Sequence, residues 1–361
     1  MTARHDARAR AGRRRVVIVA VSAAWAWATA ASAAPFENAA ALKAAVNNCL
    51  AASHTGDCDC SSVDCGAAGS DAMSQWDTSL VTDMSYLFHD ARSFNQSIGN
   101  WNTSQVTNMV GMFLYAAAFN QPIGNWDTSQ VTNMTDMFAI ARSFNQPIGD
   151  WNTSQVMDMR FMFATAYAFD SPIRNWDISQ VTNTSYMFYS LAASFNVFNQ
   201  SVENWNTSQV MDMRGMFGNA RYFNQPIGDW DTSQVWNMRW MFQGASSFNQ
   251  PIGDWDTSQV VTSYWLSSSS EMFKDATAWL CSHTHNTSDP MHFQRYYDGP
   301  PSFWFESAAG IGAVCLSPPP PTTLPCVYVA APPLTARSTG TARSSVALSL
   351  YTTVIIIYFH A

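Results

Sequence analysis

Charged residues make up only 12% of the 361-residue chain, with 18 Lys and Arg against 26 Asp and Glu and a formal net charge of −8. Proteins that bind nucleic acid carry a basic patch or stripe, and this composition does not supply one. We therefore predict no nucleic-acid partner. Because charge is scarce, Asn, Gln, Ser and Thr must provide most of the polar surface.

The sequence also lacks the patterns of common catalytic and cofactor sites. Gly310-Ile311-Gly312 is followed by Cys315 where a dinucleotide-binding fingerprint requires Gly. Glycosidases need a distinct pair of carboxylates, but the Asp residues here recur along the chain and alternate with Asn. The same columns lack the Gly-rich Asp loop of calcium-binding repeats. We predict a protein that is not an enzyme, with no catalytic residue, cofactor or metal.

The sequence is rich in one 25-residue repeat, which begins with Trp. Eight copies start at Trp76, Trp101, Trp126, Trp151, Trp176, Trp205, Trp230 and Trp255, with one longer step of 29 residues. A fixed period of this size is typical of stacked repeat architectures. Each copy places Val, Met, Phe, Ala and Ile at matching offsets. One copy cannot enclose them, so we expect stacked copies to bury them as continuous columns.

Each repeat predicts a turn, a strand and a helix in that order. Asn or Asp followed by Thr-Ser favours a turn, Q-V-T-N-M favours a short strand, and M-F-x-x-A-x-x-F has helical spacing. The predicted fold is an α/β repeat solenoid whose coils hold one short strand and one short helix. The alternative is an α-solenoid with one longer helix per repeat, which the Val-Thr pairs, Gly111 and Gly215 disfavour.

The consensus W-[DN]-T-S-Q-V-T-[ND]-M-x-x-M-F-x-x-A-x-x-F-N-Q-P-I-G-[ND] covers about Ala72 to Trp279. It resembles the repeat of BspA-like leucine-rich repeat surface proteins and, more closely, the mycoplasma-type lipoprotein repeat of unknown function. The resemblance implies a leucine-rich-repeat-like solenoid outside the cell, with adhesion or interaction roles in some members and no catalytic residues. Unlike ordinary leucine-rich repeats, this chain uses Met, Phe and Trp in place of Leu.

The segments that flank the repeats predict export. Arg-rich residues 1–15, the apolar run from Val16 to Ala30 and Ala31-Ser32-Ala33 are typical of a cleaved signal peptide. An uncleaved signal anchor is the alternative. We divide the chain into a signal peptide at 1–34, an N-terminal helical and Cys-rich cap at 35–71, the eight repeats at 72–279, a C-terminal cap at 280–316, a Pro-rich and polar linker at 317–345, and a hydrophobic tail at 346–361.

The hydrophobic tail has three interpretations. Small residues, a polar spacer and a terminal apolar run are typical of a GPI-attachment signal. A short single-pass membrane span and a misassigned gene end are the alternatives. We expect a secreted or cell-surface protein, with membrane anchorage through the tail as a possibility that the sequence leaves open.

The seven cysteines favour disulfides in an exported chain. Cys49, Cys58, Cys60 and Cys65 predict two disulfides with three possible pairings, and a metal site is the alternative. We expect Cys281 to pair with Cys315 or Cys326 rather than to join a zinc cluster with His283, His285 and His292. Among N-x-[ST] sequons, Asn286 is the best glycosylation candidate, because burial should block those that coincide with the turns of the repeats.

Residues that vary between repeats are the candidates for ligand recognition. If their rows face solvent, they form an aromatic surface with arginines beside it, which is typical of interfaces. The candidate ligand face comprises Phe161, Tyr186, Trp236, Trp240, Arg160, Arg214 and Arg239. Neutral variation, or burial against a neighbouring repeat, is the alternative. We expect a binding or adhesion scaffold for an extracellular protein or glycan, or else a structural wall or matrix component that associates with copies of itself.

Overall fold

The computed structural model describes residues 34–191, 196–260, 272–285 and 304–306. The chain divides into two units, Met1–Glu306 and Ser307–Ala361, and every described residue belongs to the first. The elements are α1 (Ala39–Ala52), the short 3₁₀ helices η1 (Gly66–Ala68) and η2 (Met73–Gln75), α2 (Thr277–Ser282), β1 (His283–His285) and β2 (Trp304–Glu306). β1 and β2 pair antiparallel.

Several predictions concern segments that the described ranges do not contain. Residues 1–33 of the predicted signal peptide, the linker, the tail, Cys315, Cys326 and Asn286 all lie outside them. Cys281 falls within α2, but its side chain is likewise outside the description. Among the described residues, no helix has the length and apolar character needed to cross a membrane.

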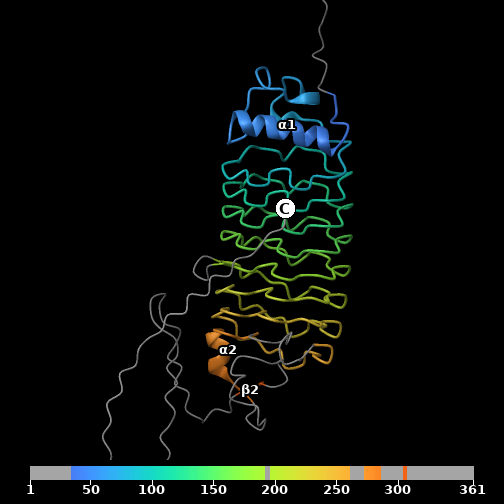
Figure 1. Ribbon diagram of the computed structural model, residues 1–361. Coiled ribbons are helices and arrows are strands. Elements are labelled where there is room, and N and C mark those ends of the chain that lie inside the picture. Colours follow the sequence, from blue (N-terminus) through green and yellow to red (C-terminus); the bar gives the residue numbers. More distant parts are fainter. Residues whose placement is uncertain (1–33, 192–195, 261–271, 286–303, 307–361) are drawn as a thin grey trace, which may run out of the picture. The chain divides into compact units, whose positions relative to one another are not determined.

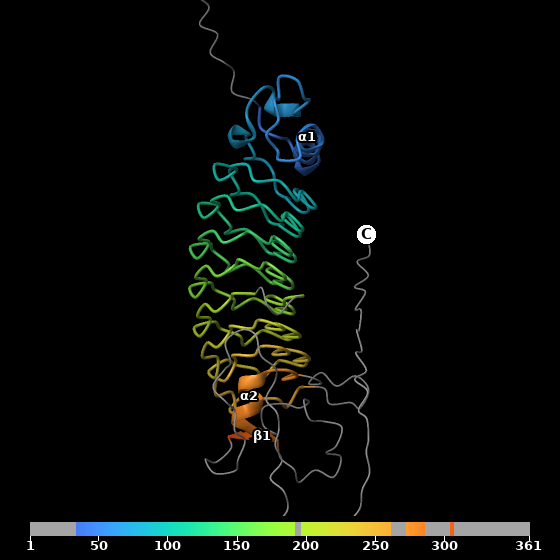
Figure 2. The same ribbon diagram turned by 90° about the vertical axis from the view of Figure 1, so that its left-hand side faces the viewer.

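The repeats lie one above the next between α1 and α2 (Figures 1 and 2). Neighbouring repeats are joined by parallel bridges of one residue each, at the eighth position counted from Trp. The bridged column consists of Asp83, Asn108, Asn133, Asp158, Asn183, Asp212 and Asn237. The strand that we predicted in each repeat is therefore reduced to a single bridging residue.

In the described residues between Trp76 and Val260 there is no helix. The reason is a left-handed backbone at the eleventh position of the repeats: φ is positive at Tyr86, Gly111, Asp136, Phe161, Tyr186, Gly215 and Trp240. A right-handed helix cannot continue through such a residue. The short helix of the predicted coil and the longer helix of the α-solenoid alternative are therefore both absent from the described repeats.

Hydrogen bonds in this segment alternate between two directions. From Met109 to Ala116, every second N–H donates to the next repeat. Of the others, Val110 N donates to Asn108 Oδ1, and the N–H groups of Met112, Leu114 and Ala116 donate to the carbonyl three residues earlier. Gly111 N donates to Thr135 O at 2.8 Å, for example, whereas Met112 N donates to Met109 O at 3.2 Å. The buried backbone is thus satisfied without a helix or an extended sheet.

Aromatic columns form the centre of the core, as predicted. Phe113 stacks between Phe88 and Phe138 at centroid distances of 5.5 and 5.4 Å, with ring planes 5° apart. Trp126 and Trp151 stack at 6.4 Å. All are buried, and each Trp also has a polar partner: Trp126 Nε1 donates to Ile98 O, 28 residues earlier in the chain, at 3.2 Å. The columns therefore combine apolar burial with satisfied indole N–H groups.

The N-terminal end of the stack is covered by α1. Within the cap predicted at 35–71, the helix begins at Ala39, because Asn38 caps it by accepting from Ala41 N at 3.0 Å. Its buried residues are Leu42, Ala45, Val46 and Cys49. Phe36, just before the helix, lies 5.4 Å from Trp76. The predicted cap on the first repeat is therefore present.

The core columns continue past both irregular steps of the sequence. After the longer step, Phe198 takes the place of the second Phe and stacks on Phe188 at 3.9 Å. In the last repeat, Met272 and Phe273 are fully buried. Trp279 completes the same column by stacking 5.8 Å from Phe248. The extra residues therefore leave the register of the core unchanged.

Gly215 tests this architecture. Its φ is +59°, and an added Cβ would meet the ring of Tyr186 from the repeat before. We expect Gly215→Ala to destabilise by about 2–5 kcal/mol, since a left-handed Ala costs about 1–2 kcal/mol and overpacking adds about 1–3 kcal/mol. The control is the same substitution in a Tyr186→Ala background, which removes the ring that the added Cβ would meet; there Gly215→Ala should cost only the first part. Urea unfolding measures both, and equal costs would contradict the contact with Tyr186.

Candidate binding surface

Five of the seven residues of the predicted ligand face form one continuous row along the stack. The Phe161 and Tyr186 rings lie parallel at 4.7 Å. The Arg214 guanidinium lies between two rings, 5.3 Å from Tyr186 and 4.6 Å from Trp240, and Arg239 lies 4.1 Å from the Trp240 ring. We call Phe161, Tyr186, Arg214, Trp240 and Arg239 the aromatic–arginine row.

The backbone explains why these side chains meet. Phe161, Tyr186 and Trp240 all occupy the left-handed eleventh position, with φ between 55° and 61°. Gly215, at the same position of its own repeat, leaves room for the Tyr186 ring. Cation–π contacts at partly exposed sites contribute about 0.5–1 kcal/mol each. The row is therefore held in place by its own contacts rather than lying free on the surface.

These contacts also decide what the row offers to a partner. The faces of the rings are covered by one another and by guanidinium groups, so they do not form an open stacking platform. The row instead presents ring edges and guanidinium N–H groups. Nε of Arg214 and Nε of Arg239 have no hydrogen-bond partner among the described residues. Both Nε atoms are buried, so they are not accessible to a partner.

Acidic groups lie beside the arginines. Arg160 Nε is 3.5 Å from Asp158 Oδ2, so Arg160 stands next to the row but is paired. Asp212 Oδ1 accepts from Arg214 N at 2.8 Å, and burial raises the pKa of Asp212. Burial also raises the pKa of Tyr186 to about 12. The Tyr186 hydroxyl is therefore neutral at physiological pH and can act as a hydrogen-bond donor.

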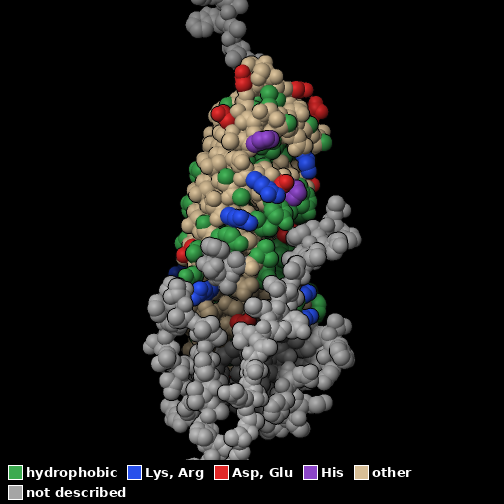
Figure 3. All heavy atoms as spheres, turned by 60° about the vertical axis from the view of Figure 1, so that its left-hand side comes forward, with side chains coloured by type: hydrophobic (Ala, Val, Ile, Leu, Met, Phe, Trp, Pro, Cys, Tyr) green, Lys and Arg blue, Asp and Glu red, His purple; other side chains and the backbone are tan. Residues whose placement is uncertain are grey.

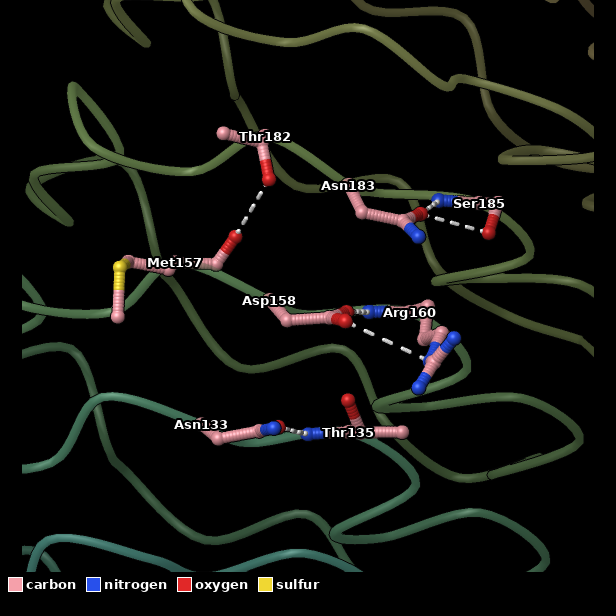
Figure 4. Close-up of polar contacts among 8 residues, drawn as sticks. All are labelled: Asn133, Thr135, Met157, Asp158, Arg160, Thr182, Asn183 and Ser185. Atoms are coloured by element: carbon pink, nitrogen blue, oxygen red, sulfur yellow. Dashed lines mark hydrogen bonds and ion pairs between the residues drawn. The ribbon is translucent and has the colours of Figure 1, made fainter.

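Trp236 lies apart from the row, at the seventh position, where four of the eight repeats carry Thr. The backbone N–H of Trp236 donates to Met211 O at 3.0 Å, and Thr182 N donates to Met157 O in the same ladder. The Thr182 hydroxyl also donates to Met157 O (Figure 4). Three large apolar side chains in this ladder are exposed: Met157 by 53%, Met211 by 45% and Trp236 by 44%. The sequence interpretation missed both methionines, although each departs from the Thr of the repeat consensus. We call Met157, Met211 and Trp236 the apolar row.

The Asn and Asp columns stabilise turns, as predicted. In Figure 4, Asn133, Asp158 and Asn183 lie in successive repeats, and each accepts from the N–H two residues further on. Neighbouring repeats also bond directly, since Asn237 Nδ2 donates to Asp212 Oδ2 at 3.3 Å. Such local bonds compete well with regular secondary structure, which is consistent with its near absence from the repeats.

Asp136 occupies the left-handed position in the repeat before Phe161. Burial raises its pKa to about 6; Arg160 opposes this shift and Asp158 adds to it. A small apolar cluster lies along the same part of the stack and contains Leu114, Ala139 and Ala164, with Tyr115 and Phe161 packed against it. This is the one group near the ligand face whose pKa is moved close to neutrality among those described.

The cysteines of the N-terminal cap form two disulfides, Cys49–Cys58 and Cys60–Cys65. One of the three possible pairings is thus selected. The sulfurs of Cys58, Cys60 and Cys65 lie within 4.8 Å of one another, so the two bridges are adjacent. Because every one of these sulfurs is engaged in a disulfide, none is available as the thiolate ligand that the alternative metal site would need.

Charged side chains are scattered over the face drawn in Figure 3, with apolar side chains between them.

The described repeats define a tandem-repeat protein whose columns of buried residues recur while its outward rows vary. Segments 61–167, 123–197 and 193–299 match the family described as "Mycoplasma protein of unknown function, DUF285". Together they span more than half of the chain, and the chain belongs to this family. No curated protein and no solved structure matches it.

The raised pKa of Asp136 predicts a pH dependence. Its carboxyl binds a proton more tightly in the folded chain (pKa about 6) than at its ordinary value of 3.8, so this group lowers stability as pH rises from about 4 to 6. Asn tolerates a left-handed backbone, and we expect Asp136→Asn to stabilise by about 3 kcal/mol at pH 7.5, since the pKa is raised by roughly two units at about 1.4 kcal/mol each. At pH 3.5 it should change little. Melting temperatures of both proteins across this range provide the measurement, and an equal gain at every pH would contradict the assignment.

Proposed function

We propose that this chain is a secreted or surface-displayed repeat protein that acts as a non-catalytic binding scaffold. The observation that supports it best is the aromatic–arginine row, in which five residues from four repeats meet on one outward line. Tyr, Trp and Arg are the residues that most often dominate binding energy at interfaces.

The proposed fold is a leucine-rich-repeat-like solenoid of the BspA-like type. Supporting it are the parallel bridges between repeats and the buried columns that recur every 25 residues. In a stack of this kind each repeat contacts only its neighbours, so that the inner columns are constrained while the outer rows are free to vary. The variable outer rows are then the natural place for recognition of an extracellular protein or glycan.

Export and anchorage are part of the same proposal. The Arg-rich start, apolar run and small residues of segment 1–34 support secretion, and the adjacent disulfides of the N-terminal cap suit an oxidising compartment. The Pro-rich segment 317–345 would act as a stiff spacer. The hydrophobic tail at 346–361 would then attach the protein to the membrane through a GPI anchor or a short span.

Self-association is the second candidate function, and the apolar row supports it. Met157, Met211 and Trp236 expose apolar side chains where other repeats carry Thr. Exposed apolar side chains that line up along one edge are candidates for protein contacts. A wall or matrix component could use this row to join copies of itself, and restoring Thr at the three positions would remove it without altering the core.

Binding of the labelled full-length chain to intact cells tests the proposal. We expect saturable binding that weakens at least about tenfold with Arg214→Ala and Trp240→Ala together, because interface hot spots cost more than about 1 kcal/mol each. The matched control is Arg142→Ala with Tyr167→Ala, a second cation–π pair at 5.6 Å outside the row. The control should bind like wild type.

Two other results would redirect the proposal. Equal binding by the row variant and the control would remove the aromatic–arginine row as the ligand face. An absence of saturable binding, combined with self-association that increases with concentration, would favour the structural function. In that case Met157→Thr, Met211→Thr and Trp236→Thr together should abolish the self-association seen by analytical ultracentrifugation.

A further inference from the structure

The turn that follows the Trp of each repeat carries N-x-[ST] sequons in several repeats. We call this turn the corner of the stack. The second residue of every repeat is Asn or Asp, and in repeats 2, 4 and 6 it is Asn followed by Thr-Ser: Asn102, Asn152 and Asn206. We expected burial to block modification at these turns. That expectation is wrong for these three residues, because all of them are exposed.

Each of the three asparagines forms the same turn with its own sequon. Asn102 Oδ1 accepts from Ser104 N at 3.1 Å, and Asn152 and Asn206 accept likewise from Ser154 N and Ser208 N at 3.1 and 3.2 Å. The turn uses only the amide oxygen. A sugar on Nδ2 therefore leaves the hydrogen bond intact, and the turn that holds the corner tolerates the modification.

The Asp-bearing repeats show where the serine hydroxyl lies in this turn. The pKa of Asp77 is lowered mainly by a hydrogen bond from the Ser79 hydroxyl and, to a smaller extent, by one from the Ser79 N–H. Asp127 and Asp177 are affected in the same way by Ser129 and Ser179. The serine, which is the third residue of the sequon, therefore brings its hydroxyl to the side chain that would accept the sugar. These two residues are the pair that defines the sequon.

Two other sequons in the same stack have the opposite surroundings. Asn133 and Asn183 lie in the bridged column, where each faces the asparagine or aspartate of the adjoining repeats (Figure 4). Their hydroxyl residues, Thr135 and Ser185, are only 4% and 6% exposed. A glycan on either asparagine would have to displace an adjoining repeat. They serve as internal controls with the same sequence signal and a different environment.

We propose that Asn102, Asn152 and Asn206 are N-glycan acceptors and that Asn133 and Asn183 are not. In the reaction, Asn Nδ2 attacks the anomeric carbon of an oligosaccharide carried on a lipid diphosphate. The new C–N bond forms as the C–O bond to the diphosphate breaks, the lipid diphosphate leaves, and one amide proton passes to a base of the transferase. Asn95 and Asn199, whose amide oxygens bond to the next repeat, are not part of the proposal.

This inference rests on the proposed entry into the secretory route, and the experiment separates the two. The full chain is expressed in a eukaryotic secretory host with its own leader and, in parallel, with a leader of the host. Secreted and cell-retained chains are treated with peptide N-glycosidase in ¹⁸O water and mapped by mass spectrometry. Glycosylation with only the host leader would oppose the proposed secretion and still support the three acceptors.

The repeats supply conservative variants, because Asp naturally occupies this corner elsewhere. Asn102→Asp, Asn152→Asp and Asn206→Asp should each remove one glycan and preserve secretion. Asp127→Asn creates a fourth sequon at the same exposed turn, where Ser129 N donates to Oδ1 at 3.0 Å, and should add one glycan. Unmodified Asn102, Asn152 and Asn206 in chains that have entered the secretory route, or glycans at Asn133 and Asn183 in secreted protein, would overturn the inference.

Discussion

The stack depends on the way its backbone divides hydrogen bonds between two directions. Left-handed residues at the eleventh position turn alternate N–H groups toward the next repeat, while the intervening ones close tight turns within their own repeat. Neither set alone would pair all the buried N–H and C=O groups, and buried polar groups must be paired. The aromatic columns, the bridged column and the outward rows all take their positions from this division.

The 25-residue period of the sequence predicted which residues are buried in the core. It did not predict the backbone conformation of the repeats. Tryptophans, phenylalanines and methionines at fixed offsets are buried as expected, because apolar residues that recur in every repeat must be covered by the neighbours. The helix was not found because its spacing of three and four also fits successive turns. Gly111 and Gly215 hinted at a left-handed position, but Phe161, Tyr186 and Trp240 occupy it as well, and bulky residues rarely do so.

The candidate surface was predicted only in part. Variation between repeats correctly singled out residues that lie on outward rows, and five of them meet. The sequence could not indicate that Arg214 would fill the space between Tyr186 and Trp240, since that depends on where a left-handed backbone points each side chain. The sequence also could not show that Trp236 lies apart from the aromatic–arginine row. Trp236 is at the seventh position of its repeat, whereas the aromatic residues of the row are at the eleventh.

The tryptophan column has an optical consequence. Indoles such as Trp126 and Trp151 lie parallel at 6.4 Å, and Trp151 and Trp176 at 6.5 Å. At such separations an excited indole transfers its energy to its neighbour before it emits. Light absorbed in one repeat therefore migrates along the column. The protein carries an intrinsic reporter of whether adjacent repeats remain in register.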